Sequence, residues 1–499
     1  MRNRLLPLSV LALLGTAATA SAQEVSAPPI PVSPPQAQDE SKALLSVSES
    51  GLTAEQVGKR AAQTSYTAKA NEEALHAAAA RVDQAWASFL PRLSGLARYT
   101  RLSDFTPPSL GNPNVNFVGT FDPPTDPKNP KPLNPANQFS TPLGFAFPLV
   151  VDNWLLQATL TVPISDYFLR INQNYTAATS SQTAARYDVA TARAKSAADG
   201  RVIYYQWLSA RGALVVASEA LEDQKTHSTD VKNQFTVGNV SKADVLRADT
   251  AVASAELQVV RSKNYLDLTE KQLRLAMHGK DDETYTPGEA LDAPLQPLTG
   301  ALRDLVIEAQ SSRLEIKSID ANAEAARRQA QVARAGAYPS VNAFADAVYA
   351  NPNQRRFPQS SEWFPTWDAG VQLTWAPNDV LTALAAGRSI DAQAAQIEAQ
   401  KLTVRDGIEL ETTQGFQGAL EADQALATAK RELASATEAY RVARELFNAG
   451  RSTSVTLTDA ETELTRARLD ELNAKTNARL SRVRLEHALG RDTKDVQTQ

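Results

Sequence analysis

The segment WLLQATLTV, residues 154–162, alternates apolar and polar side chains along its length, and so does WDAGVQLTW, residues 367–375. A period of two with one apolar and one largely polar face predicts a half-exposed β-strand. About nine to eleven such residues, with Trp at the ends, match a tilted strand that crosses a membrane. From the alternation alone, a soluble hairpin with one packed face remains the alternative.

In the membrane interpretation, the apolar face of each segment meets lipid and the polar face meets an aqueous lumen. The side chains expected to face lipid are Trp154, Leu156, Leu160, Val162, Trp367, Val371, Leu373 and Trp375. The four predicted strands cover about residues 92–101, 153–163, 340–350 and 366–376. Because a closed spanning barrel needs about eight strands or more and an open edge cannot lie in lipid, the chain must oligomerise. Two or three copies supply about eight or twelve strands, and twelve enclose a passage.

The connections between these strands are polar and irregular. Residues 103–149 contain eleven Pro between Pro107 and Pro148, too many for a helix or a central strand. Residues 351–365 form a shorter equivalent. Long loops at one end and helices at the other are typical of a barrel whose loops face outward.

Long helices are predicted on the other side of the strands. No Pro occurs from Asp166 to Phe235 or from Asp379 to Phe447, so each run can form one helix of about 65 residues. The helix that follows Gly238 repeats every seven residues, which predicts a coiled-coil seam. Its seam positions are Val245, Val252, Val259, Leu266 and Leu273, with Ala248, Ala255, Ser262, Thr269 and Ala276 three residues on.

The chain repeats itself. LPRL at 90–93 recurs as YPSV at 338–341, and FTVG at 235–238 recurs as FNAG at 447–450. Ordered self-similarity of this kind predicts two copies of one helix–strand–strand–helix–helix unit. The predicted division is a first repeat at 51–279, a Pro-containing linker at 280–299, a second repeat at 300–490 and a tail at 491–499.

The N-terminus has the three parts of a secretory signal in the right order. Arg2 and Arg4 precede an apolar run over 5–14, and the small residues at 20–22 suit cleavage, so residues 1–22 are predicted to be removed. Residues 23–50 are a Pro-rich flexible segment. Nothing after it approaches about 18 consecutive apolar residues, so membrane insertion requires strands.

Composition excludes several classes of function. The 499 residues carry 51 Lys+Arg against 56 Asp+Glu, which argues against nucleic-acid binding. The absence of Cys excludes disulfides, thiolate metal sites, a Cys nucleophile and a lipidated N-terminal Cys. The four His show no ligand spacing, and no catalytic motif stands out. We therefore expect no metal, no cofactor, no catalytic residue and no enzyme activity.

These features together resemble the TolC-like outer membrane factor family, the trimeric exit ducts of drug efflux pumps and type I secretion systems. The resemblance rests on the signal peptide, the duplicated unit, the Pro before the first strand of each unit and the Phe-x-x-Gly turns, and it covers about residues 45–490. It implies a mainly α fold with a membrane β-barrel contribution: a trimeric twelve-stranded barrel on a long periplasmic α-helical coiled-coil barrel. The implied role is passive conduction of cargo across periplasm and outer membrane. The implied partners are two further copies, a periplasmic adaptor (membrane fusion) protein, an inner-membrane pump and outer membrane lipid.

Carried over by position, the two Phe-x-x-Gly turns form the periplasmic aperture and contact the adaptor. The corresponding residues are Phe235, Gly238, Asp244, Phe447, Gly450, Arg451 and Asp459. Each Gly suits a left-handed turn between helices. The family implies that the acids ring a closed aperture; the alternative is that they only begin helices, where the helix dipole favours carboxylates. Ser452 and Thr456 depart from the family pattern of a locking Arg and a second acid.

A soluble periplasmic coiled-coil adaptor or scaffold is the second hypothesis for the whole chain. It explains the long helices. It does not explain two alternating strands of membrane type or the Pro-rich connection between strands.

Overall fold

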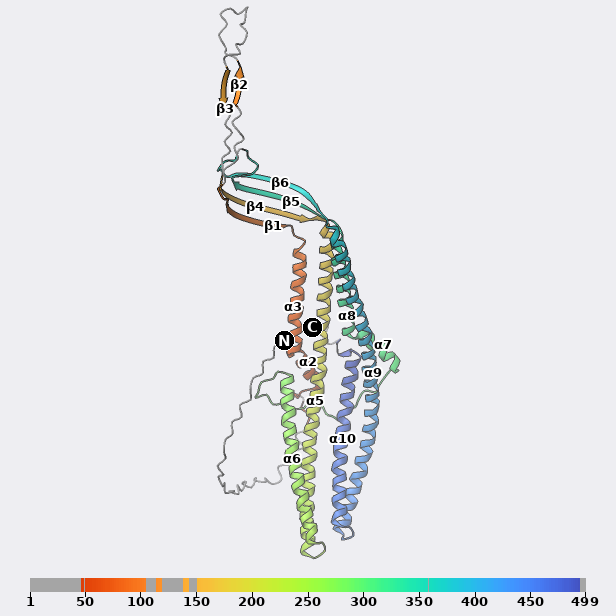
Figure 1. Ribbon diagram of the computed structural model, residues 1–499. Helices are drawn as coiled ribbons and strands as arrows, with labels where there is room; N and C mark the ends of the chain where they lie inside the picture. Colours follow the sequence, from red (N-terminus) through yellow and green to blue (C-terminus); the bar gives the residue numbers. More distant parts are fainter. Residues whose placement is uncertain are drawn as a thin grey trace, which may run out of the picture.

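The computed structural model describes residues 46–48, 50–104, 114–118, 138–142, 150–357 and 359–493. The expected signal segment lies outside these residues, as do much of the Pro-rich segment and most of the C-terminal tail. A stack of long helices carries a four-stranded sheet at one end and ends in two helical turns at the other (Figure 1). The mainly helical fold class is confirmed.

Each half of the chain contains two helices, then two strands of the four-stranded sheet, then two long helices. The first half contains α2 (Ala54–Thr64), α3 (Tyr66–Ala87), β1 (Arg92–Arg101), β4 (Asp152–Pro163), α4 (Ile164–Asp166), η1 (Tyr167–Ile171), α5 (Asn172–Thr236) and α6 (Lys242–Ala276). The second contains α7 (Leu302–Ser312), α8 (Leu314–Arg334), η2 (Ala335–Ala337), β5 (Ser340–Asn351), β6 (Phe364–Thr374), α9 (Pro377–Asn448), α10 (Ser454–Ala488) and η3 (Arg491–Thr493).

Proline-free sequence produces the long helices that it predicts. Helix α5 has 65 residues and α9 has 72, so each extends about 100 Å or more at 1.5 Å per residue. Helix α9 begins with Pro377, where the missing N–H is not needed. The short helix α4 and a π-helical stretch, η1, join the end of β4 to α5.

The seven-residue repeat of α6 forms a packed seam. Among its positions, Val245, Ala248, Ser262, Leu266, Thr269 and Leu273 are buried. Small residues at the second position of each repeat let the partner helix approach closely. Helix α6 packs on α5, and α10 packs on α9, so each pair is an antiparallel hairpin.

The four strands form one antiparallel sheet in the order β1-β4-β5-β6. The register places Leu160 beside Leu93 and Ala345, and Thr159 beside Ser94 and Asp346. Side chains directly opposite each other share a face, so Thr159 and Asp346 lie on the face opposite to Leu160, and that face also carries Leu96. Strands β1 and β6 are its edges, each paired on one side within the described chain.

The connection 103–149 is not wholly irregular, contrary to the sequence-based expectation. It contains strands β2 (Asn114–Val118) and β3 (Gln138–Pro142), which pair antiparallel in a separate two-stranded sheet. Figure 1 shows this hairpin standing beyond the four-stranded sheet. In a two-stranded sheet every strand is an edge, so Pro142 is tolerated where a central strand would exclude it.

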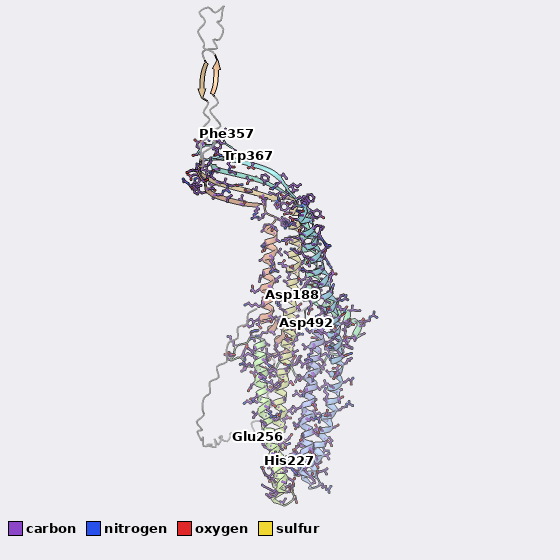
Figure 2. All side chains as sticks on the ribbon, in the orientation of Figure 1. Asp188, His227, Glu256, Phe357, Trp367 and Asp492 are labelled. Atoms are coloured by element: carbon purple, nitrogen blue, oxygen red, sulfur yellow. The ribbon has the colours of Figure 1, made fainter. Side chains whose placement is uncertain are left out.

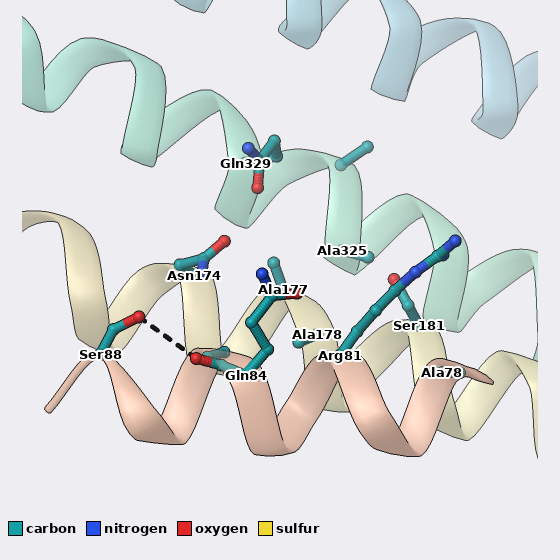
Figure 3. Close-up of a pocket in the computed structure, with 12 residues that line it drawn as sticks. Ala78, Arg81, Gln84, Ser88, Asn174, Ala177, Ala178, Ser181, Ala325 and Gln329 are labelled. Atoms are coloured by element: carbon teal, nitrogen blue, oxygen red, sulfur yellow. Dashed lines mark hydrogen bonds between the residues drawn. The ribbon is translucent and has the colours of Figure 1, made fainter. Parts of the chain in front are cut away.

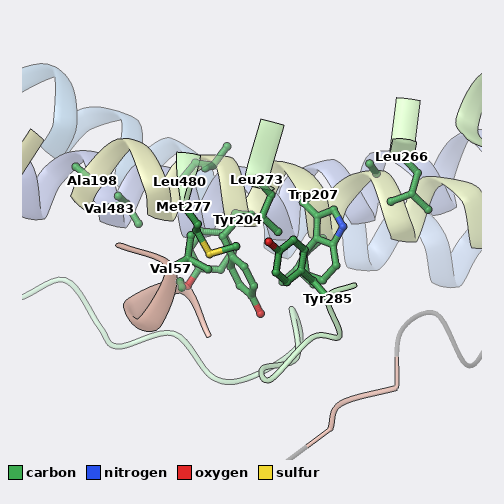
Figure 4. Packing of buried hydrophobic residues seen from close by; sticks show 14 residues of the cluster. Val57, Ala198, Tyr204, Trp207, Leu266, Leu273, Met277, Tyr285, Leu480 and Val483 are labelled. Carbon is green, nitrogen blue, oxygen red and sulfur yellow. The ribbon is translucent and has the colours of Figure 1, made fainter. Parts of the chain in front are cut away.

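The predicted linker is part of the core rather than a free connection. Leu52 forms a parallel bridge with Pro287, and the Tyr204 hydroxyl donates to the Leu52 carbonyl at 2.6 Å. A Cβ added to Gly51 would lie 2.2 Å from the Pro287 carbonyl oxygen, so only Gly allows this approach. Tyr285 of the linker lies in the cluster around Trp207 (Figure 4).

No helix among the described residues is long and apolar enough to cross a bilayer.

Candidate functional site

The two faces of the sheet carry different chemistry. Trp154, Leu156, Leu160, Trp367, Val371 and Leu373 are exposed on one face, and Val162 lies half-buried at its end. Trp367 has 74% of its surface exposed, whereas Trp side chains in soluble proteins are highly buried on average. Strand β6 ends at Thr374, two residues before the predicted end, so Trp375 lies just outside it, exposed, with its indole N–H donating to the Ala337 carbonyl at 3.4 Å.

Aromatic side chains gather at the strand ends far from the helices. Tyr99 and Trp154 lie 4.4 Å apart between ring centroids, and Tyr349 and Trp363 lie 4.9 Å apart. The Arg356 guanidinium lies 4.7 Å from the centroid of Phe364. Amphipathic rings at the end of an apolar band are typical of a membrane–water interface.

The opposite face mixes polar side chains with apolar ones such as Leu96 and Val348. The Gln157 amide donates to Asp346 at 2.9 Å, and the Thr159 hydroxyl also donates to that carboxylate. One row away, the Phe344 ring lies over Gly370, where an added Cβ would meet it at 3.0 Å. This face therefore carries hydrogen-bonding groups that suit water beside its apolar side chains.

At the far end of the molecule, two turns join the helical hairpins. Gly238 between α5 and α6 has φ +80°, and Gly450 between α9 and α10 has φ +69°. Both values lie in the left-handed region that favours glycine. Phe235 and Arg451 are exposed beside these turns. Figure 2 shows Trp367 on the sheet and His227 near the turns, at opposite ends of the molecule.

The two tip acids have different environments. Asp244 accepts hydrogen bonds from the Ser241 backbone N–H at 3.0 Å and the Ser241 hydroxyl at 2.6 Å, which makes a capping box for α6. These bonds, the hydroxyl's first, hold the pKa of the Asp244 carboxyl below its ordinary value. Asp459 is exposed on α10. Asp244 therefore caps the start of α6 and Asp459 presents its charge to solvent, and a place for either acid at the aperture stays a prediction.

Phe447 does not lie on the tip surface. Only 3% of its surface is exposed, and it packs in a cluster with Val231, Val245 and Leu457 from the other tip helices. Its ring stacks on His227, with centroids 5.6 Å apart. The inner faces of both hairpins enclose the ring in this chain, so Phe447 is not exposed at the tip surface, and its place at the aperture stays a prediction.

A buried polar network beside Phe447 joins the two hairpins. His227 on α5 is 2% exposed; its Nδ1 lies 3.0 Å from Glu461 Oε1, and its Nε2 lies 3.1 Å from Ser454 Oγ. The Gln224 amide donates to the other Glu461 oxygen at 3.0 Å. Further along, Arg468 on α10 pairs with Asp223 on α5 at 3.2 Å. This network, which we call the hairpin seam, holds α5 against α10.

Sequence reasoning missed the hairpin seam. His227 and Glu461 are 234 positions apart, and neither belongs to a motif. A usable signal was present: Glu461 lies between Leu457 and Leu464, both buried on α10, so a charged residue there needed a buried partner.

The helices also enclose a small pocket of about 510 Å³ near the sheet (Figure 3). Helices α3, α5 and α8 line it with alanines and the polar side chains of Arg81, Gln84, Asn174 and Gln329. Among the described residues, no group of three or more His, Asp or Glu side chains is placed to hold a metal.

Comparison with known proteins adds a family match. The family described as "Outer membrane efflux protein" matches residues 57–279 and 305–491. The toluene efflux pump outer membrane protein TtgF of Pseudomonas putida is 27% identical over 320 residues, as is the probable efflux pump outer membrane protein SepC from another strain of the same species. Each match covers 60% of this chain and 62% of the relative's length, so the chain spans somewhat less than two thirds of these relatives.

Solved structures share the fold. The outer-membrane channel OprN superimposes with a TM-score of 0.69 at 17% identity, over 90% of this chain and 95% of that one. The Campylobacter jejuni CmeC outer membrane channel gives 0.68 at 16% identity, over 91% and 94%. At this identity the likeness speaks for the fold alone.

Proposed function

The chain belongs to the outer membrane efflux protein family, and from this premise we propose that it is the outer membrane exit duct of a tripartite efflux pump or a type I secretion system. It conducts cargo passively across periplasm and outer membrane. The observation that carries the proposal is the sheet: an exposed apolar face with aromatic ends lies back to back with a hydrogen-bonding face, on helices about 100 Å long.

We further propose that three copies assemble. Four strands with two open edges cannot lie in lipid alone, and three copies give about twelve strands around a water-filled passage. The apolar band then contacts outer membrane lipid, and the helical hairpins reach through the periplasm. The signal peptide predicted over residues 1–22 fits this destination.

The tips are the proposed contact with a periplasmic adaptor and, through it, an inner-membrane pump. The relatives named above are described as efflux pump outer membrane proteins. In this chain the exposed tip side chains Phe235, Val237, Arg451 and Val455 are available for such a contact, whereas Phe447 is not. A soluble adaptor or scaffold is the weaker hypothesis, because water would have to cover the apolar face of the sheet.

Single cysteines test the orientation cleanly, since the chain has no native Cys. Gln354→Cys in the β5–β6 turn is expected to react with a membrane-impermeant maleimide on intact cells. Asn239→Cys at the α5–α6 turn is expected to react only after the outer membrane is breached. Labelling of Asn239→Cys on intact cells would reverse the proposed orientation. The outward placement expected for most of 103–149 concerns residues outside the described chain.

Conduction and charge selection are tested together in a planar bilayer. Three copies of Asp459 near one axis concentrate negative charge at a constriction and favour cations. Asp459→Asn is expected to lower the cation-over-anion permeability ratio by roughly twofold or more. Glu256→Gln, the same change in charge well up α6, is expected to leave the ratio unaltered. Absence of channels from wild-type trimers would contradict the proposed function, and an unchanged ratio in Asp459→Asn would remove Asp459 from the aperture.

A further inference from the structure

The two open edges of the sheet carry opposite charge. Strand β1 contains Arg92, Arg98 and Arg101 and no acidic residue. Strand β6 contains one charged residue, Asp368. Opposite charges on neighbouring strands stabilise a pair, and like charges oppose it. The edges are therefore complementary to each other rather than to themselves.

The strand register shows which arginines share a face with Asp368. Asp368 lies opposite Asp346, Asp346 opposite Thr159, and Thr159 opposite Ser94. This cross-strand row lies on the polar face. Because successive side chains alternate, Arg92 and Arg98 lie on the same face as Ser94, whereas Arg101 lies on the other.

The charges on this face are unevenly matched within one chain. Asp368 pairs with Arg355 at 3.1 Å, but it also lies directly opposite Asp346, whose recorded donors are the neutral Gln157 and Thr159. Within the described residues, the side chains of Arg92 and Arg98 form no hydrogen bond or ion pair, although both backbones belong to the β1–β4 ladder. Two acids on β5 and β6 thus face one cation, while the side chains of two arginines on β1 have no acidic partner in the described part of the chain.

The strand bounds indicate which arginine meets Asp368. The row lies two residues from the helix-side end of β1, at Ser94, but six residues from that end of β6, at Asp368. From β1 to β6, the row therefore moves away from the helices, toward the strand ends that lie far from them. In a symmetric assembly, β1 of the next copy lies at the same distance from the helices as β1 of the first copy. When the row continues by one more strand, it therefore meets the next β1 in the half that is far from the helices, near Thr100.

We propose that Arg98 of one copy pairs with Asp368 of the next on the polar face, and that this ion pair fixes the register of the β6–β1 junction between copies. The inference rests on the threefold assembly proposed above and states which charged residues align neighbouring copies in it. Arg98 lies one side-chain step from Thr100 on the same face, within reach of a long side chain across a strand pair. Arg92, at the helix-side end, is too far along the strand to take this role.

Engineered disulfides test the register in the full-length protein in outer membranes. Asp368→Cys combined with Thr100→Cys, the position directly opposite, is expected to give covalent dimers and trimers on oxidation. Asp368→Cys combined with Arg92→Cys is expected to remain monomeric on a denaturing gel. A bond within one chain is excluded, because three strand spacings put β1 about 14 Å from β6, whereas a disulfide needs Cα atoms within about 7 Å.

Charge reversal tests the pairing itself. Arg98→Asp and Asp368→Arg are each expected to lower trimer yield at least about fivefold, and the double reversal is expected to restore most of it. Arg92→Asp combined with Asp368→Arg is the matched control and is expected not to restore it. Two results would overturn the inference. One is a normal trimer yield in every reversal variant of a chain whose wild type forms trimers, and the other is cross-linking only through Arg92→Cys. A wild-type chain that forms no trimer would instead refute the proposed assembly.

Discussion

Leu373→Arg is expected to abolish most trimer assembly, whereas Gln372→Arg, one residue away, is expected to leave it largely intact. Leu373 is exposed on the apolar face of β6, and Gln372 points to the polar face opposite Asn342. A charge facing hydrocarbon costs about 2–4 kcal/mol per chain at the midplane and less toward the strand ends, such as the helix-side end of β6 where Leu373 lies, and a trimer incurs this cost in every copy. The measurement is the yield of trimers extracted from outer membranes.

The same contrast is available on a central strand. Leu160→Arg on β4 is expected to behave like Leu373→Arg, and Thr161→Arg is expected to assemble far better. Equal yields within each pair would show that the two faces do not meet lipid and water as proposed. Total expression, measured before extraction, separates a loss of assembly from a loss of synthesis.

His227→Leu is expected to loosen the helical tips. The substitution removes the partner of Glu461 Oε1 and the neighbour of Ser454 Oγ, leaving a carboxylate that is 3% exposed with the Gln224 amide as its recorded donor. A buried charge that loses its partner costs about 2–4 kcal/mol. We expect faster amide hydrogen exchange at the C-terminal end of α5 and the N-terminal end of α10, and little change in exchange near the sheet.

Two further variants make this result specific to the hairpin seam. Replacing His227 and Glu461 together by Leu removes both polar groups and is expected to recover at least half of the lost protection, because no buried charge remains unpaired. His76→Leu on the exposed side of α3 is expected to alter stability by less than about 0.5 kcal/mol. Unchanged exchange in His227→Leu would contradict a structural role for the seam.

The tip acids show where sequence reasoning reached its limit. Both Asp244 and Asp459 stand near the start of a returning helix, and position alone does not separate a cap from a solvent-facing charge. Ser241 makes Asp244 a helix cap, since its hydroxyl and N–H both donate to Asp244 Oδ2. This S-x-x-D spacing is a local signal, and it was available in the sequence.

The sequence by itself determined every feature that depends on neighbours along the chain. Alternation over 154–162 set the two faces of β4, the absence of Pro set the length of α5, and Gly238 and Gly450 set the two turns. These features follow from local sterics and side-chain period, which act over a few residues.

Only the tertiary structure decided which surfaces meet. It buried Phe447 against His227, joined His227 to Glu461 across 234 positions, drew Tyr285 of the linker into the core and paired β2 with β3. The physical reason is that the relative rotation and axial position of two long helices depend on packing along their whole contact. A pattern of residues within one helix does not determine how that helix aligns with another.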